Sequence, residues 1–214
     1  MEPFRLVTDH LSKTYGDLDI FKDLNFTLES GQTYCLMGPS GCGKTTLFRV
    51  LLGLEPASGG SFRLVSHDGD SFYPKLNIKG IRQHRTGLPL VAVFQENRLC
   101  DSFSPLDNVL LGVRNTMDRE AVYRELCLLL PEEAILRPAA TLSGGMKRRV
   151  AILRALLAPS CGILMDEPFT GLDEDTKSTV IAYIKEKTAG KLLMVSTHQE
   201  EDIPALNGKL LRLF

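Results

Sequence analysis

"TYCLMGPSGCGKTTLFRVLLGLEP" spans residues 33–56 and contains three patterns in succession. An apolar run at 33–37 indicates a short buried strand, and the glycine-rich segment at 38–43 indicates a loop. From Lys44 the apolar residues Leu47, Val50, Leu51 and Leu54 recur at helical spacing, until Pro56 and the following glycines stop the pattern. The stretch therefore predicts a strand, a loop and a helix in direct succession.

The loop fits the phosphate-binding pattern G-x-x-x-x-G-K-[S/T]. Glycines let backbone N–H groups converge on an anion, and the amino-terminal end of the following helix favours phosphate. We expect Lys44 to reach the β- and γ-phosphates, Thr45 to bind Mg²⁺ and Thr46 to contact the α-phosphate. The predicted nucleotide contacts here are Gly38, Ser40, Gly41, Cys42, Gly43, Lys44, Thr45 and Thr46. The alternatives are a glycine-rich turn that binds nothing and, for Cys42, a redox-sensing role.

A second motif, "CGILMDEP" at residues 161–168, is an apolar strand that ends in two carboxylates. Open α/β sheets bind ligands at the carboxyl ends of their strands. Because adjacent side chains on a strand alternate in direction, we expect Asp166 to bind the metal or its water. Glu167 would face the attacking water as a general base or a water-orienting group. An acidic turn after a buried strand is the alternative interpretation.

Other apolar runs, at 90–94, 162–165 and 192–196, resemble strands that are covered on both faces. A helical pattern at 174–188 lies between the last two, which predicts a right-handed β-α-β unit. Leu24, Phe26 and Leu28 alternate with polar residues before a turn at 30–31, which predicts a strand that a turn joins to the strand at 33–37. A helical insertion is expected within 105–138, with an amphipathic helix over 118–130, and residues 67–85 are interpreted as a loop or irregular edge without chemistry.

Bulk composition restricts the class of protein. The chain has 214 residues, 43% of them hydrophobic, and 25 basic against 26 acidic side chains, so its net charge gives no attraction for nucleic acid. The five cysteines are scattered without CxxC spacing, which favours reduced thiols in a cytoplasm. We expect no secretion signal and no membrane span, because no stretch approaches the roughly 20 apolar residues that a span requires.

The segment "TLSGGMKRRVAILRALLAPSCGILMDEPFTGLD" at residues 141–173 resembles the ATP-binding cassette family, and the resemblance extends over nearly the whole chain. Leu142 to Gly145 match the LSGG signature, in which Ser143, Gly144 and Gly145 would bind a γ-phosphate. The signature ends in Met146 where glutamine is usual, which puts the strength of dimer closure in doubt. Thr170 and Gly171 replace the commoner Ser-Ala before Leu172 and Asp173.

Other motifs follow in the family's order. Gln95 resembles the Q-loop glutamine, which implies metal binding and coupling, whereas the alternative is a surface amide. His198 resembles the switch histidine that contacts the γ-phosphate, although a structural histidine is common after a strand. Residues 171–173 resemble the D-loop. Tyr15 resembles the aromatic residue that stacks on adenine, with a strand-end tyrosine as the alternative.

The resemblance implies an α/β fold of the P-loop NTPase class. Its core would be a largely parallel covered sheet, with an amino-terminal antiparallel β portion and a helical subdomain as an insertion. We expect one ATPase domain over residues 1–214, divided into a catalytic core at 1–94 and 155–214 and a helical subdomain at 95–154 that carries the signature.

The family's cassettes pair head to tail around two ATP molecules, which implies a homodimer or a paired cassette. A cassette without membrane spans resembles the subunit that drives a separate permease, so we expect a cytoplasmic protein held on the inner face of the cell membrane. A solute-binding protein would accompany an import system. Leu99, Phe103 and Leu106 either line a groove for a short permease helix or belong to the subdomain core.

A different class of function is a soluble cassette clamp that acts on nucleic acid or the ribosome. Such relatives usually have coiled-coil insertions, tandem cassettes or basic surfaces, and this chain has none of these in its sequence. A nucleotide kinase shares only the phosphate loop, and the LSGG motif and His198 exclude it. The sequence therefore favours an ATP-hydrolysing transport subunit.

Overall fold

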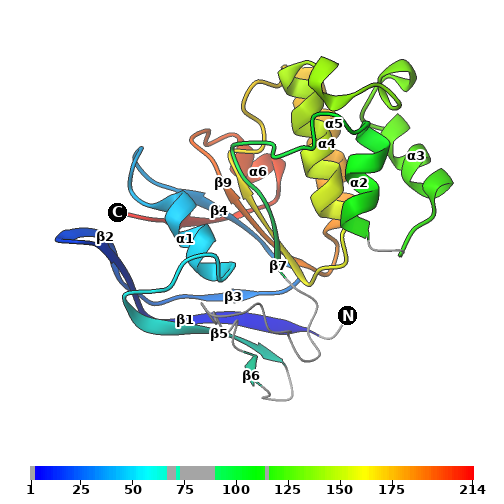
Figure 1. Ribbon diagram of the computed structural model, residues 1–214. Helices are drawn as coiled ribbons and strands as arrows, with labels where there is room; N and C mark the ends of the chain where they lie inside the picture. Colours follow the sequence, from blue (N-terminus) through cyan, green and yellow to red (C-terminus); the bar gives the residue numbers. More distant parts are fainter. Residues whose placement is uncertain (1–2, 67–70, 73–89, 114–115) are drawn as a thin grey trace.

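The computed structural model describes residues 3–66, 71–72, 90–113 and 116–214, which form two sheets and a group of helices (Figure 1). The parallel sheet has the order β10-β4-β9-β8-β7. Its strands are β4 (Thr33–Met37), β7 (Leu90–Val93), β8 (Gly162–Asp166), β9 (Leu192–Ser196) and β10 (Lys209–Arg212). The other sheet is antiparallel and contains β1 (Phe4–Tyr15), β2 (Leu18–Leu24), β3 (Thr27–Glu29), β5 (Gly59–Ser66) and β6 (Ser71–Phe72).

The parallel sheet is covered on both faces, because alternate residues of β4, β7, β8 and β9 enter different cores. In β8, Ile163 and Met165 face a core formed with the larger helices, whereas Leu164 faces a core shared with α1 (Lys44–Leu51) and the antiparallel sheet. β8 and β9 are buried over their whole length. These strands therefore have continuous apolar runs, and the predicted P-loop α/β fold with its covered parallel sheet is confirmed.

The larger helices gather on the face of the parallel sheet opposite α1 (Figure 1). They are α2 (Pro105–Val113), α3 (Arg119–Cys127), α4 (Gly144–Leu157) and α5 (Glu174–Lys187), with the short α6 (Asp202–Ala205) and the 3-10 turns Glu132–Ala134 and Ala139–Thr141. Asp118, Ser143 and Asp173 cap α3, α4 and α5, and each side chain accepts a hydrogen bond from a backbone N–H of the first turn. Among the described residues, no helix has the length and apolar character needed to cross a membrane.

The structure corrects two predicted helix ends. α1 ends at Leu51 and not near Pro56, because Gly53 adopts a φ of 67° and the N–H groups of Gly53 and Leu54 bond the carbonyls of Val50 and Arg49. Leu54 is consequently 57% exposed. α3 ends at Cys127 and not at residue 130.

The alternating residues 24–28 are divided between β2 and β3, and β3 lies in a different sheet from β4. The predicted loop at 67–85 lies mostly outside the described residues, although 71–72 form the edge strand β6, paired with β5. The predicted boundary between residues 154 and 155 falls within α4. The division into a catalytic core and a helical subdomain stays a prediction.

Candidate nucleotide site

Four neighbouring parallel strands bring the predicted site residues to one edge of the sheet. The phosphate loop follows β4, His198 follows β9, Asp166 and Glu167 stand at the end of β8, and Gln95 follows β7. The register places Met165 opposite both Val93 and Val195, so these strands end at similar heights. The sheet therefore brings together residues that lie up to 160 positions apart in the chain.

The phosphate loop is shaped by two glycines that other residues cannot replace. Gly43 has a φ of 93°, and a Cβ there would lie 2.5 Å from Cγ2 of Ile20. A Cβ on Gly38 would lie 2.3 Å from the carbonyl oxygen of Leu213. The first turn of α1 has neither a side-chain cap nor an acidic residue, so its N–H groups are suited to an anion.

Lys44 lies against the same loop. Its Nζ donates to the carbonyl oxygens of Gly38, at 2.8 Å, and Pro39, at 3.1 Å, and the residue is 7% exposed. The Sγ of the half-buried Cys42 lies 4.0 Å from this ammonium group. The loop thus concentrates one cation and several backbone N–H groups beside the start of α1.

Oxygen atoms from three elements meet beside this loop. Thr45 Oγ1 on α1 donates to Asp166 Oδ2 at 2.5 Å, and Ser196 Oγ at the end of β9 donates to Asp166 Oδ1 at 2.5 Å. Asp166 is only 3% exposed. A buried carboxylate beside a hydroxyl group is the kind of oxygen set that binds Mg²⁺, so these residues fit that ion.

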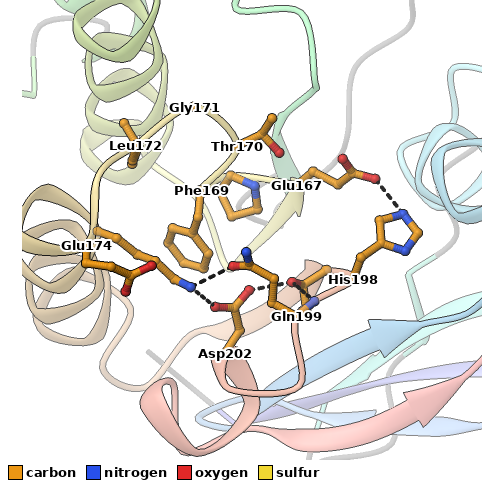
Figure 2. A pocket seen from close by; sticks show the side chains of 12 residues that line it. Glu167, Phe169, Thr170, Gly171, Leu172, Glu174, His198, Gln199 and Asp202 are labelled. Carbon is orange, nitrogen blue, oxygen red and sulfur yellow. Dashed lines mark hydrogen bonds and ion pairs between the residues drawn. The ribbon is translucent and has the colours of Figure 1, made fainter.

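Glu167 turns away from Asp166 and toward solvent. Its backbone has a φ of 47°, and its N–H donates to both the carbonyl and the hydroxyl oxygen of Ser196, each at 3.1 Å. Its Oε1 lies 2.9 Å from Nε2 of His198 (Figure 2). The two carboxylates therefore have separate partners and separate environments, because the chain leaves β8 after Asp166 and Glu167 adopts a left-handed conformation.

A polar network supports the turn that carries His198 (Figure 2). Lys177 on α5 bonds Asp202 Oδ1 and Gln199 Oε1, each at 2.7 Å, and Asp202 accepts a hydrogen bond from Thr197. Lys177 and Asp202 are both nearly inaccessible, so the ion pair is desolvated and the geometry is tightly held. These residues line a cavity of about 270 Å³ that also reaches Glu167 and His198.

Tyr15 lies at the end of β1, beside the region that follows α1. Its hydroxyl donates to Glu55, which raises the pKa of Tyr15 and lowers that of Glu55. The ammonium group of Lys13 lies 4.7 Å from the centroid of the tyrosine ring. Tyr15 is 46% exposed, so a planar ring can reach it.

The structure does not join the signature residues to the phosphate loop of the same chain. Ser143 caps α4 and is exposed together with Gly144, on the face of the sheet opposite α1. A Cβ on Gly145 would lie 3.4 Å from the carbonyl oxygen of Gly171, so the signature borders its own D-loop. Among the described residues, no hydrogen bond connects residues 143–145 with residues 38–46.

Sequence reasoning missed two residues that hold the site. Ser196 was identified only as the end of an apolar strand, although a hydroxyl group at the carboxyl end of a buried strand is a usable signal. Arg148 on α4 is 3% exposed and bonds several backbone carbonyls around Glu167. Arginine is usually exposed on helices, so the sequence did not indicate that Arg148 is buried or that it holds the site.

Comparison with known proteins agrees with this geometry. The sequence profile of the ABC transporter family matches residues 21–170, which is most of the chain. The chain belongs to the ABC transporter family. The phosphate loop and the paired carboxylates lie within the matched range, whereas Tyr15 and His198 lie outside it.

Individual relatives are similar over almost all of this ABC chain. It is 35% identical to the taurine import ATP-binding protein TauB of Shigella dysenteriae serotype 1, over 92% of this chain and 74% of that protein. It is 31% identical to the Fe(3+) ions import ATP-binding protein FbpC of Agrobacterium fabrum, over 99% of this chain and 59% of that protein. Among solved structures, the dimeric ATP-binding cassette MJ0796 with bound ADP and Pi has a TM-score of 0.78 at 26% identity, over 97% of this chain and 94% of that chain.

Membership of this family establishes the basic activity. ABC cassettes bind nucleotide and hydrolyse ATP, and the similar cassette was captured in a post-hydrolysis state. The chain is therefore an ABC-type ATPase.

Proposed function

We propose that this chain is the ATP-hydrolysing subunit of an ABC importer, which works as one of two paired cassettes beneath a membrane permease. The observation that carries the proposal is the convergence of four strand ends on one nucleotide site, while the signature residues lie exposed on the opposite face. A site of this kind is complete only when a second cassette supplies its signature.

The loop between β4 and α1 would bind the phosphates of the nucleotide. Its backbone N–H groups surround the phosphates, and Lys44 exchanges its bonds to loop carbonyls for bonds to the β- and γ-phosphates. Thr45 and Asp166 would hold Mg²⁺, with Gln95 as a further ligand from the end of β7. The ion would neutralise phosphate charge in the transition state.

Glu167, after β8, and His198, after β9, would carry out hydrolysis. The Glu167 carboxylate accepts a proton from the attacking water, and His198 donates to the γ-phosphate. Their contact of 2.9 Å holds both side chains at the same edge before nucleotide arrives. The cavity beside them gives the water a place to approach.

Tyr15 would stack on the adenine ring. Lys13 covers one face of the tyrosine ring and Glu55 holds its hydroxyl group, so the ring is fixed in orientation and retains exposed surface for the base.

Two cassettes would clasp ATP between unlike faces. Ser143, Gly144 and Gly145 of one copy would donate to the γ-phosphate held by the phosphate loop of the other, and loss of that phosphate would open the interface. Exposure of Ser143 and Gly144 supports this arrangement, as do the dimeric structures of a similar cassette. The second cassette is an identical copy or a paired homologue.

The direction of transport is inferred from the relatives. TauB and FbpC are import ATP-binding proteins by name, which supports an importer with a permease and a solute-binding protein, and a location on the inner face of the membrane. Phe103 is 42% exposed and available for a permease contact, with the partly buried Leu99 beside the helical core. Leu106 is 2% exposed and packs in that core, which supports the second of the two alternatives for this residue.

The Glu167→Gln substitution tests the catalytic assignment. Removal of the general base is expected to lower phosphate release at least about 100-fold, while the intact phosphate loop still binds ATP. The variant should therefore elute from gel filtration as a dimer with ATP and Mg²⁺, and as a monomer without nucleotide. Glu133→Gln, an equal charge change on an exposed turn, should release phosphate like the unmodified chain. Wild-type turnover by Glu167→Gln would contradict the role of Glu167.

Co-purification tests the partner. Expressed with the adjacent reading frames, the tagged chain is expected to bring down a polytopic membrane protein whose presence stimulates ATP hydrolysis. Recovery of nucleic acid or ribosomes without any membrane protein would instead support the soluble clamp.

A further inference from the structure

Arg148 is the most extensively bonded buried cation in the described part of the chain. It lies in the second turn of α4, five residues after Ser143, and is 3% exposed. Burial lowers the pKa of its guanidinium group to about 10, and the nearby charges of Asp166 and Glu167 oppose that shift. A cation buried this deeply is retained only where its hydrogen bonds and charge are used.

Three consecutive carbonyl groups converge on this guanidinium. Arg148 Nη2 donates to the carbonyl oxygens of Asp166, at 2.6 Å, and Glu167, at 2.7 Å, and its Nε donates to that of Pro168, at 3.0 Å. The left-handed conformation of Glu167, with a φ of 47°, turns successive carbonyls toward one point. Such a conformation is unfavourable for a residue other than glycine and persists only when its surroundings hold it.

The backbone of Glu167 is thereby fixed at both ends. The Ser196 hydroxyl group accepts a hydrogen bond from the N–H of Glu167, and Arg148 donates a hydrogen bond to the carbonyl oxygen of Glu167. The direction of the Glu167 side chain toward His198 follows from this backbone conformation. Loss of the guanidinium would leave three carbonyl dipoles facing one another, and the turn would relax toward an ordinary conformation.

The same guanidinium also reaches the segment after β7. Arg148 Nη1 donates to the carbonyl oxygen of Phe94, at 2.5 Å, and lies 3.4 Å from both the carbonyl oxygen of Gln95 and Oδ1 of Asn97. One side chain therefore binds the backbone at the carboxyl ends of both β7 and β8. It stands on the helix that begins with the signature residues.

We propose that Arg148 is a positioning residue for ATP hydrolysis, which holds the strained turn at Glu167 and the backbone of Gln95 in their reactive places. The inference rests on the proposed role of Glu167 as general base. Lysine cannot replace this group, because its ammonium is a single compact centre with three donors, whereas the planar guanidinium spreads five donors over carbonyls of two segments.

Steady-state kinetics of the full chain test the proposal, with Arg148→Gln and Arg148→Lys as the variants. Displacement of a catalytic group by about 1 Å costs up to about 100-fold in rate, so we expect kcat to fall about 10- to 100-fold in both variants. The KM and the Kd for a fluorescent ATP analogue should stay within about threefold of the unmodified values, since no phosphate-loop contact is removed.

Arg154→Gln is the matched control. Arg154 also lies on α4 and its pKa is also lowered by burial, but its guanidinium bonds the carbonyls of Arg98 and Asn97, away from Glu167 and from the signature residues. This variant should lose thermal stability while its kcat stays within about twofold. The comparison separates positioning of the turn from a general contribution of the helix to stability.

A double substitution distinguishes positioning from folding. Glu167→Gln/Arg148→Gln should still form the ATP-dependent dimer that Glu167→Gln forms, because positioning acts on hydrolysis and not on closure. A kcat within threefold of the unmodified chain in both Arg148 variants would overturn the proposal. So would loss of ATP binding in parallel with kcat, or failure of both variants to fold. If Glu167→Gln itself hydrolyses ATP normally, the proposed general base is wrong, and this result is separate from the kinetics of Arg148.

Discussion

Ser196→Ala, compared with Ser160→Ala, tests whether the buried hydroxyl group at the end of β9 stabilises the site. Both serines are almost fully buried, at 0% and 1% exposure, so the two substitutions remove the same atom from similar environments. Ser196 Oγ donates to Asp166 and accepts from the N–H of Glu167. Ser160 Oγ has no hydrogen-bond partner among the described residues.

The expected difference follows from these contacts. A hydrogen bond to a charged group contributes about 1.5–3 kcal/mol, so Ser196→Ala should lower the free energy of unfolding by about 2 kcal/mol. The bond from Glu167 N–H to the Ser196 carbonyl survives and limits the loss. Ser160→Ala removes an unsatisfied buried hydroxyl group, so its free energy of unfolding should stay level or rise by roughly 1 kcal/mol.

The assay is urea unfolding followed by circular dichroism, without nucleotide or Mg²⁺, with thermal melts alongside. For a chain of this size, each kcal/mol of unfolding free energy shifts the melting temperature by about 2–4 °C. The melting temperatures of the two variants should therefore differ by roughly 4–12 °C. Ser196→Ala should also have a lower kcat, because the backbone of Glu167 loses one of its anchors. Equal unfolding free energies for the two variants, within about 0.5 kcal/mol, would refute the reasoning.

Three further expectations concern the loop, the aromatic residue and the thiols. Lys44→Ala should weaken ATP binding about 100-fold by isothermal titration, since a charged phosphate contact is lost; unchanged affinity would contradict its role. Tyr15→Ala should weaken ATP binding about tenfold and Tyr15→Phe hardly at all, because base stacking contributes about 1–3 kcal/mol, whereas equal losses would indicate that the hydroxyl group matters and the ring does not. Burial raises the pKa of Cys35 and Cys161 to about 11 from the usual 9.0, so at pH 8 a thiol reagent should label three cysteines and these two only after unfolding. Because the folded-state pKa is raised, the stability from these neutral thiols is complete below pH 9 and falls between pH 9 and 11, which urea midpoints across that range would reveal.

The parallel core was predictable because its strands are buried on both faces. Runs such as 192–196 contain only apolar residues before the terminal serine, and parallel strands necessarily end at one edge. Because the phosphate loop follows β4 and Asp166 ends β8, their position at that edge was predictable from the strands alone. Local sequence therefore specified both the strands and the edge where their ends meet.

Pairing between strands was not predictable in the same way. The turn at Gly31 is real, with a φ of 77°, but the strands on its two sides belong to different sheets. A turn specifies a change of direction, whereas the partner of each strand depends on distant residues. The burial of Leu106 and the exposure of Phe103 likewise depend on how α2 packs against α4.

The role of Arg148 at the site could not be predicted from sequence patterns. Its partners are backbone carbonyls, which every residue possesses and no sequence pattern identifies. Such a contact is specified by the three-dimensional path of two separate loops. Gly53 shows a milder case, since a glycine near a helix end was visible but its exact role as terminator required the backbone bonds.

The alternation of strand residues between two cores has an evolutionary consequence. Ile163 and Leu164 are neighbours in the chain, yet their side chains contact different groups of residues across the sheet. Substitutions in the helical layer and in the layer around α1 therefore rarely share a neighbour, and their effects on stability should be nearly additive. A lineage is thus free to exchange apolar residues of the helical layer while the layer around α1 retains its own packing unchanged.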